Sequence, residues 1–443
     1  MSTGRVLVSL RRRNFRLFLA GQLVSNSGTW MQNVALAWLV LQVSHSPLDV
    51  GLVSALQFLP SLVFGVYGGL VGDRFQKRKV LVITQGGMAF AAALLATLDF
   101  VNLTPLWVLY LVTFVSGTFQ AIDTPVRQAF LSEMVGPDDL PNAVGLNSAA
   151  FNTTRIAGPA LGAIAIRVAG VGACFGLNAF SYLAVITALL AMKTSELYPS
   201  QPIRKGRGQI REGLRYVWRT PRLRQTLGLL AVVGTLAFNF NTVFPVLAKS
   251  GFHGNAGTYA TMLVALGAGS VVGALVAASR RRPRQGVVVL AALAMGVLEL
   301  LAAAEHNLDL EIGLLGLVGV ASMLYLSTSN STCQLASAPE MRGRVMAVYS
   351  VVFLGSTPIG SSLIGLLDQE FSARWGLVGG GLPTVVAALV LGALLFRRLR
   401  PSRRGQAVAV RMRGPATVVL AGGADGHGAV ETGHQGERQA ARR

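Results

Sequence analysis

Charged side chains are scarce in this 443-residue chain, because Asp, Glu, Lys and Arg together make up 13% of it. An ordinary soluble domain carries roughly 25%. Cysteine is scarcer still. Cys174 and Cys333 lie far apart in apolar segments without a CxxC partner, so neither a disulfide framework nor a structural zinc site fits. We read both cysteines as small buried hydrophobic residues.

Sequence motifs for catalysis are also lacking. The chain contains no G-x-x-x-x-G-K-[ST] loop, which argues against an ATP-driven pump, and no H-E-x-x-H pair. Its five histidines fall in expected loops or in the tail. We therefore expect no enzyme, no metal and no cofactor.

Apolar residues dominate what is present, at 52% of the chain, with a mean hydropathy of +0.53. The net charge of +20 would suggest nucleic acid in a soluble protein, but the long apolar runs overrule that interpretation. We expect no nucleic-acid partner. The sequence predicts an all-α polytopic membrane protein with twelve transmembrane helices, at 15–41, 48–71, 80–100, 106–129, 141–168, 171–192, 224–248, 256–279, 286–304, 311–335, 345–367 and 376–396.

These segments fall into two sets of six, which predict two pseudo-symmetric bundles at 14–192 and 224–396. The stretch from Val50 to Arg74 can be laid on 256–280 at a constant offset, as expected of a repeated half. A basic linker at 193–223, where apolar residues alternate with arginines, predicts an interfacial amphipathic helix. We expect 1–13 to be a cytoplasmic N-terminal segment and 397–443 a disordered basic tail.

Lys and Arg are distributed unevenly between the two sides of these helices. Of the 39, all but Arg155, Arg167, Lys249 and Arg374 fall on the side of the N-terminus. The positive-inside rule then places both termini and the linker in the cytoplasm of a cell that we expect to be bacterial. Membrane lipids are expected partners, with anionic lipid attraction as a secondary effect of the charge.

The most specific motif lies in the short loop between the second and third expected helices. Basic residues alone are expected in any cytoplasmic loop. What makes this loop specific is the combination of its basic residues with a glycine and an aspartate. A glycine permits close helix packing, and a carboxylate can face a helix N-terminus or a cation. We expect a gating motif made of Gly69, Asp73, Arg74, Lys77 and Arg78.

This motif resembles the G-x-L-a-D-r-x-G-r-k signature of the major facilitator superfamily, with Gln76 in place of the second glycine. The fifth expected helix is similar to the superfamily's antiporter motif, which favours export. Generic small-residue packing is the alternative. The matching positions are Gly145, Gly158, Pro159 and Gly162, while Thr154 and Ala163 depart from the pattern.

Several longer stretches extend the resemblance from about residue 14 to 396. They include FRLFLAGQLVS, SPLDVGLVSALQFLPSL, DTPVRQAFLSEMV, NSAAFNTTRIAGPALG and STCQLASAPEMRGRV. Together they resemble the branch that contains the enterobactin exporter and macrolide-efflux-like proteins. The resemblance implies a monomeric secondary transporter that exports siderophores or drug-like molecules by alternating access, coupled to protons. It also implies that an acid at Asp123 pairs with Lys77 or Arg78 at the gate.

Polar residues inside the expected helices are candidates for the transport path. On the first helix they form one stripe within about 60° at 100° per residue, and the seventh helix repeats the pattern. Hydrogen bonding between helices, without any contact with substrate, is the alternative interpretation. The stripe consists of Gln22, Asn26, Thr29 and Asn33, and its counterpart of Thr235, Asn239 and Thr242.

Ionisable residues inside the expected helices are further candidates for a role in transport. Asp123, Arg127 and Arg155 are gate or coupling candidates, although Arg155 could instead be paired structurally. Arginine keeps its proton at physiological pH, so Arg155 cannot carry the transported proton. Glu299 falls on the ninth helix, which is peripheral in the superfamily, and we expect no role in transport for it.

The sequence therefore predicts a cell-membrane exporter of a small amphipathic molecule. A flippase or importer of lipid-like substrates with the same fold is the alternative within transport, and a non-transporting receptor is the alternative outside it.

Overall fold

The computed structural model describes residues 8–198, 209–279 and 285–399, and its secondary structure in those residues is helical throughout. The expected tail beyond residue 399 and the middle of the linker lie outside the described residues. The first half contains α1 (Arg13–Ser44), α2 (Pro47–Arg74), α3 (Lys77–Phe100), α4 (Leu106–Ala169) and α5 (Val171–Leu190).

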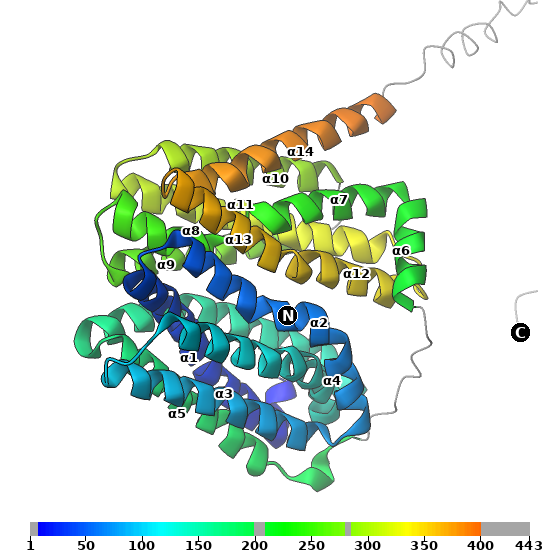
Figure 1. Cartoon of the computed structure of the whole chain (residues 1–443). Coiled ribbons are helices and arrows are strands. Elements are labelled where there is room, and N and C mark those ends of the chain that lie inside the picture. The colour runs from blue at the N-terminus through cyan, green and yellow to red at the C-terminus, as the bar shows by residue number, and fades with distance from the viewer. Residues whose placement is uncertain (1–7, 199–208, 280–284, 400–443) are drawn as a thin grey trace, which may run out of the picture. The chain divides into compact units, whose positions relative to one another are not determined.

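The linker contributes α6 (Gln209–Arg219), which agrees with the expected amphipathic helix. The second half follows as α7 (Pro221–Leu236), α8 (Phe240–Val246) with a π-turn at Leu247–Gly251, α9 (Ala256–Ala278), α10 (Gln285–Ala304), α11 (Leu308–Leu335), α12 (Arg342–Gly355), α13 (Thr357–Glu370) and α14 (Trp375–Leu399). Figure 1 shows these helices along the chain.

Local sequence signals explain where the helices begin and end. Ser46 caps α2 by accepting a hydrogen bond from the Asp49 N–H, with Pro47 at the first helical position. Asn255 forms a capping box with Thr258 at the start of α9. Asn307 caps α11 in the same way as Ser46 caps α2, through the N–H groups of Asp309 and Leu310.

The 64-residue α4 consists of two helices separated by a kink. At 1.5 Å per residue it would be about 96 Å long, three times the ~30 Å hydrocarbon core of a bilayer. It is broken at Gly136, whose φ of 77° is left-handed, and Pro137 follows directly. The sequence predicted a loop between the spans at 106–129 and 141–168. The structure instead has helix between them, interrupted at Gly136.

Ten described helical segments are long and apolar enough to cross a membrane. One of them is the whole of α4, which holds two crossings, and α1 falls outside the ten because its polar stripe lowers its hydropathy. Counting α4 twice and adding α1 is consistent with twelve crossings. The predicted fold class is confirmed by this helical architecture.

Two expected spans are interrupted. The span expected at 224–248 is divided by a non-helical break at 237–239, between α7 and α8. The span expected at 345–367 is divided at Ser356, between α12 and α13. Pro358 explains the second break, because proline is disfavoured inside a helix and favoured in its first turn.

Helices pack chiefly within each half of the chain. In the first half, α4 contacts α1 and α2, and α5 contacts α1 and α3; in the second, α11 contacts α9 and α10. Between the halves, α2 packs on α13 and the later part of α4 on α9. Figure 1 shows α2 beside the second half of the chain. We call the end of the helices near the α1–α2 turn the α1–α2 end, and the opposite end the α2–α3 end.

Candidate functional site

A buried acid and its partners form a polar network inside the first half. Asp123 is 1% exposed, and its Oδ1 accepts hydrogen bonds from Thr84 Oγ1 at 2.8 Å and Gln85 Nε2 at 2.9 Å. Its Oδ2 lies 3.4 Å from Arg127 Nε. Arg127 in turn donates to Gln22 Oε1 at 2.6 Å, so the network joins α1, α3 and α4. A charge pair with this many partners can be buried at a tolerable cost.

The expected pairing of Asp123 with the basic loop is wrong in this structure. Lys77 instead lies 2.6 Å from Glu133 Oε1, and Arg78 donates to the backbone carbonyls of Leu189 and Leu190. Glu133 is ten residues beyond Asp123 on α4, about 15 Å farther along the axis, which brings it level with the loop. Its position three residues before the Gly136 break is the signal that would have identified it.

The other members of the gating motif contribute less to the described contacts. Arg74 is exposed at the end of α2. The backbones of Gly69 and Asp73 belong to α2, but their side-chain surroundings lie outside the described residues. Their gating role stays a prediction.

The polar stripe of α1 is engaged with neighbouring helices. Besides the bond from Arg127 to Gln22, Asn26 Oδ1 accepts from Arg127 at 3.5 Å. Thr29 Oγ1 lies 3.3 Å from Tyr182 Oη, and Asn33 Oδ1 accepts from Gln57 Nε2 at 3.1 Å. These bonds favour the packing interpretation that the sequence left open, and contact with substrate stays a prediction for this stripe.

The counterpart residues lie around the break between α7 and α8. Asn239 Nδ2 donates to the Thr235 carbonyl at 2.6 Å and to the Leu236 carbonyl at 3.1 Å, which satisfies groups that the break frees. Thr242 Oγ1 lies 3.4 Å from Ser54 Oγ of α2, across the two halves. The sequence did not reveal this break because the whole stretch Pro221–Gly251 is apolar enough to be one membrane span.

A cavity of about 70 Å³ lies where the two halves meet in the middle of the helices. Its walls come from α1, α4, α8, α9 and the break before α8. The lining residues are Trp30, Arg155, Pro159, Phe238, Phe240, Asn241, Leu263 and Leu266. Aromatic and aliphatic side chains around a few polar groups are typical of a small-molecule site, but such sites measure about 300–1,000 Å³, so this cavity would have to widen to hold a drug-sized molecule.

Arg155 is the charged residue of this cavity. Its guanidinium carbon lies 5.8 Å from the centroid of the Trp30 ring, within the range of a cation–π contact. In the described part of the chain Arg155 has no ion-pair partner and donates no side-chain hydrogen bond. An arginine at this depth costs about 2.5–3.5 kcal/mol on insertion scales, so it needs water or an anion to compensate.

The antiporter-like motif places this arginine. A Cβ at Gly158 would lie 2.8 Å from the Ser27 carbonyl and would also collide with Trp30, so this glycine lets α4 approach α1. Gly162 lies against Met31 one turn further, and Pro159 lines the cavity. Gly145, by contrast, is exposed, and a Cβ there would meet nothing within 4 Å, so it takes no part in this packing.

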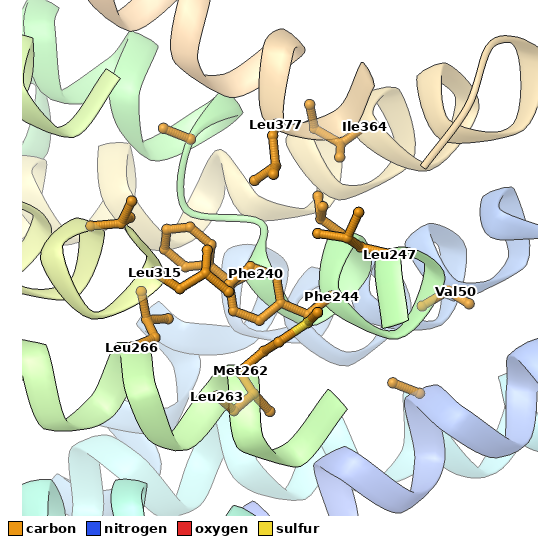
Figure 2. Close-up of a cluster of buried hydrophobic side chains, with 14 of the residues drawn as sticks. Val50, Phe240, Phe244, Leu247, Met262, Leu263, Leu266, Leu315, Ile364 and Leu377 are labelled. Carbon is orange, nitrogen blue, oxygen red and sulfur yellow. The ribbon is translucent and has the colours of Figure 1, made fainter. Parts of the chain in front are cut away.

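Apolar side chains close the α1–α2 end beside the cavity. Figure 2 shows Phe240 and Phe244 of α8 between Leu263 and Leu266 on one side and Leu247 on the other. Val50 of α2 and Ile364 of α13 belong to the same cluster, and all of these side chains are buried. We call this apolar cluster the seal. Phe240 also lines the cavity, so the cavity and the seal are in direct contact.

Close backbone contact and a few hydrogen bonds reinforce the closure. Gly51 of α2 packs directly against α13. A Cβ at this position would collide with the Ser361 carbonyl and would lie 3.3 Å from the Gly365 Cα. Lys249 Nζ donates to the Leu41 carbonyl at 3.1 Å, and Ser46 Oγ donates to Gln369 Oε1 at 2.8 Å. These contacts join the halves at the α1–α2 end.

Glu299 on α10 lies away from the cavity-lining set. It is 1% exposed, and neither carboxyl oxygen has a hydrogen-bond partner within the described residues. Gly380 and Gly381 of α14 lie against it, because a Cβ at either position would lie 3.1 Å from a Glu299 atom. Its position between α10 and α14 agrees with a location outside the cavity.

The helical architecture, the seam between two halves and the mid-helix cavity define a membrane transporter of the major facilitator superfamily. Solved structures of this class share the fold. A POT family transporter in complex with a thioalcohol-conjugated peptide superposes with a TM-score of 0.70 at 10% identity, covering 88% of this chain and 97% of its own. A bacterial homologue of the human lysosomal transporter Spinster gives a TM-score of 0.67 at 14% identity, covering 86% and 95%.

The chain belongs to the transmembrane secretion effector family, whose model matches residues 5–420. Among curated relatives, the staphyloferrin A transporter of Staphylococcus aureus is 23% identical over 85% of this chain and 94% of its own length. The multidrug efflux pump Tap of Mycolicibacterium fortuitum is 28% identical over 89% and 98%. The enterobactin exporter EntS of Citrobacter koseri is 25% identical over 87% and 93%. These relatives are membrane transporters rather than enzymes.

Proposed function

We propose that this transporter exports a small amphipathic molecule that carries negative charge, such as a siderophore or an acidic drug-like compound. Arg155 carries the proposal, because its guanidinium lies over the Trp30 ring, has no ion-pair partner among the described residues, and faces a cavity whose other walls are mostly aromatic and aliphatic, with Asn241 as a further polar group. An anionic group on the substrate would compensate the buried charge, and its apolar part would contact Phe238 and Phe240. The siderophore transporters among the relatives support the same substrate class.

Transport would proceed by alternating access between two bundles, residues 14–192 and 224–396. The seal at the α1–α2 end supports a state in which the cavity is closed on that side. The distribution of Lys and Arg supports a cytoplasmic location for the termini and the α2–α3 end. The seal would then be the external gate, and the chain would act as a monomer.

Proton coupling is the finer part of the proposal, and Asp123 is the candidate carrier. Arg155 keeps its charge throughout, whereas Asp123 is a buried carboxylate that Arg127, Thr84 and Gln85 hold inside the first half. Asp123→Asn should abolish transport driven by a pH gradient while leaving substrate exchange at equal pH intact. Loss of both activities in properly inserted protein would contradict a coupling role.

Proteoliposomes test the proposal as a whole. Purified protein is reconstituted, and uptake of a fluorescent catecholate or carboxylate probe is compared with that of its neutral ester, with and without a pH gradient. We expect uptake of the anionic probe that depends on the gradient. Equal uptake of lipid-like probes without a gradient would instead support the flippase or importer alternative, and no uptake of any probe would support a receptor.

A further inference from the structure

The linker helix α6 has two faces with different partners, and the inner face holds it to the second half of the protein. Gly213 and Val217 are buried, and a Cβ at Gly213 would lie 3.1 Å from the Arg344 Cβ and carbonyl. Glu212 pairs with Arg344 at 2.5 Å, and Tyr216 Oη accepts a hydrogen bond from the Ala338 N–H at 3.1 Å. In Figure 1, α6 runs across the ends of α7 and α12. These contacts fix its orientation.

The outer face of α6 combines positive charge with exposed apolar groups. At 100° per residue its members span about 140° of the helix. Leu214 is 46% exposed, and Trp218 is 62% exposed although Arg224 of α7 lies over its ring, 6.0 Å from the centroid. Exposed arginines lie between and beside them on the same face. We call this set the α6 outer face, and it consists of Arg211, Leu214, Arg215, Trp218 and Arg219.

The charge of this face is not neutralised by the part of the protein that the structure describes. Arg211, Arg215 and Arg219 form no ion pair with any described residue. Glu212, the acid of this helix, is turned toward Arg344. The chain from residue 397 onward carries ten arginines against three acidic residues, so its charge does not complement this face. The arginines of this face are therefore available to an external anion.

We propose that the α6 outer face binds the headgroups of anionic phospholipids. A tryptophan and a leucine exposed among arginines are typical of the membrane interface, where the apolar groups enter the acyl boundary and the guanidinium groups contact phosphate. An acidic protein partner would explain the arginines but would leave the role of Trp218 and Leu214 open. Because α6 is held to Arg344 near the start of α12, bound lipid would also anchor that end of α12 at the membrane surface.

Fluorescence quenching of Trp218 tests this binding directly in the full-length protein. Vesicles contain a brominated lipid at equal mole fraction, either phosphatidylglycerol or phosphatidylcholine, and the Trp218 signal is obtained by subtracting the Trp218→Phe variant. We expect brominated phosphatidylglycerol to quench more strongly, with a preference on the order of fivefold for each arginine at low salt. The preference should decline at high salt, because exposed charges are screened.

The triple variant Arg211→Gln, Arg215→Gln, Arg219→Gln should lose the headgroup preference. Arg167→Gln, which removes an exposed arginine at the other end of the helices, should keep it. Equal quenching by both lipids in the wild type, or an unchanged preference in the triple variant, would overturn the proposal. As an independent measurement, short-chain phosphatidylglycerol added in detergent should raise the melting temperature of the wild type more than phosphatidylcholine does. A melting temperature that responds equally to both lipids would also overturn it.

Discussion

Replacing Arg155 by glutamine should separate substrate binding from stability. Arg155 has no ion-pair partner among the described residues, so its charge costs about 2.5–3.5 kcal/mol at this depth. Glutamine keeps a polar group, on a shorter side chain, and carries no charge. The melting temperature of Arg155→Gln should therefore equal or exceed that of the wild type.

Transport of an anionic substrate should fall in the same variant. A hydrogen bond to a charged group contributes about 1.5–3 kcal/mol, which corresponds to roughly a 10- to 150-fold weaker binding. The assay is concentration-dependent uptake into proteoliposomes at matched protein content, with Arg167→Gln as the control from the end of the same helix. Arg155→Lys should retain part of the affinity, because it keeps the charge but loses the planar contact with Trp30.

Unchanged uptake of the anionic probe by Arg155→Gln would refute the reasoning, as would a loss of uptake accompanied by a lower melting temperature. The second result would mean that Arg155 stabilises the fold through a partner rather than waiting for a ligand.

Three further tests examine the packing on which the site depends. Gly51→Ala should impair transport and increase the labelling of a cysteine placed at the seal, because the new Cβ would collide with the Ser361 carbonyl. Gly145→Ala is the control: its new Cβ would meet nothing within 4 Å, so it should behave as wild type in both assays. Glu299→Gln should retain most transport and raise the melting temperature, since an amide removes an ionisable group that has no partner among the described residues; loss of transport would contradict its assignment outside the cavity. Lys77→Gln and Glu133→Gln should lower the melting temperature by less in combination than the sum of the single effects, and additive effects in the double-mutant cycle would contradict their pairing.

The sequence was sufficient to predict the class of fold, because apolar runs about 20 residues long and biased loop charges are dictated by the bilayer itself. It was also sufficient to place Arg155 on a helix that reaches the centre, through the small residues Gly158 and Gly162 that follow it. The linker helix followed from the alternation of arginines with Leu214, Val217 and Trp218. Each of these signals is local and periodic.

Pairings across the structure could not be read in the same way. Asp123 and Glu133 are both acids on α4. Which of them pairs with Lys77 depends on the position of the α2–α3 loop along the axis of α4. The stripe on α1 was correctly placed on one side of the helix, but Trp30, about 70° from the centre of the stripe at 100° per residue, is the α1 residue that lines the cavity. Periodicity defines a face, whereas the neighbour that covers it depends on the packing of other helices.

The placement of charge in this protein has a mechanical consequence for a transporter whose halves must separate. The ion pairs of Arg12, Lys77 and Arg127 lie in the first part of the chain, that of Lys193 with Glu196 lies within the linker, and that of Glu212 with Arg344 joins α6 to α12. Between the halves, the hydrogen bonds at the α1–α2 end are those of Lys249 to a carbonyl, Ser46 to Gln369 and Thr242 to Ser54. Each contributes about 0.5–1.5 kcal/mol net, and the apolar seal contains no buried charge that would be left unpaired on opening. The Asp123–Arg127 network thus ties α1, α3 and α4 together inside the first half, while the seam between the halves depends on contacts that can be exchanged at low cost, which is the condition that a rocking movement requires.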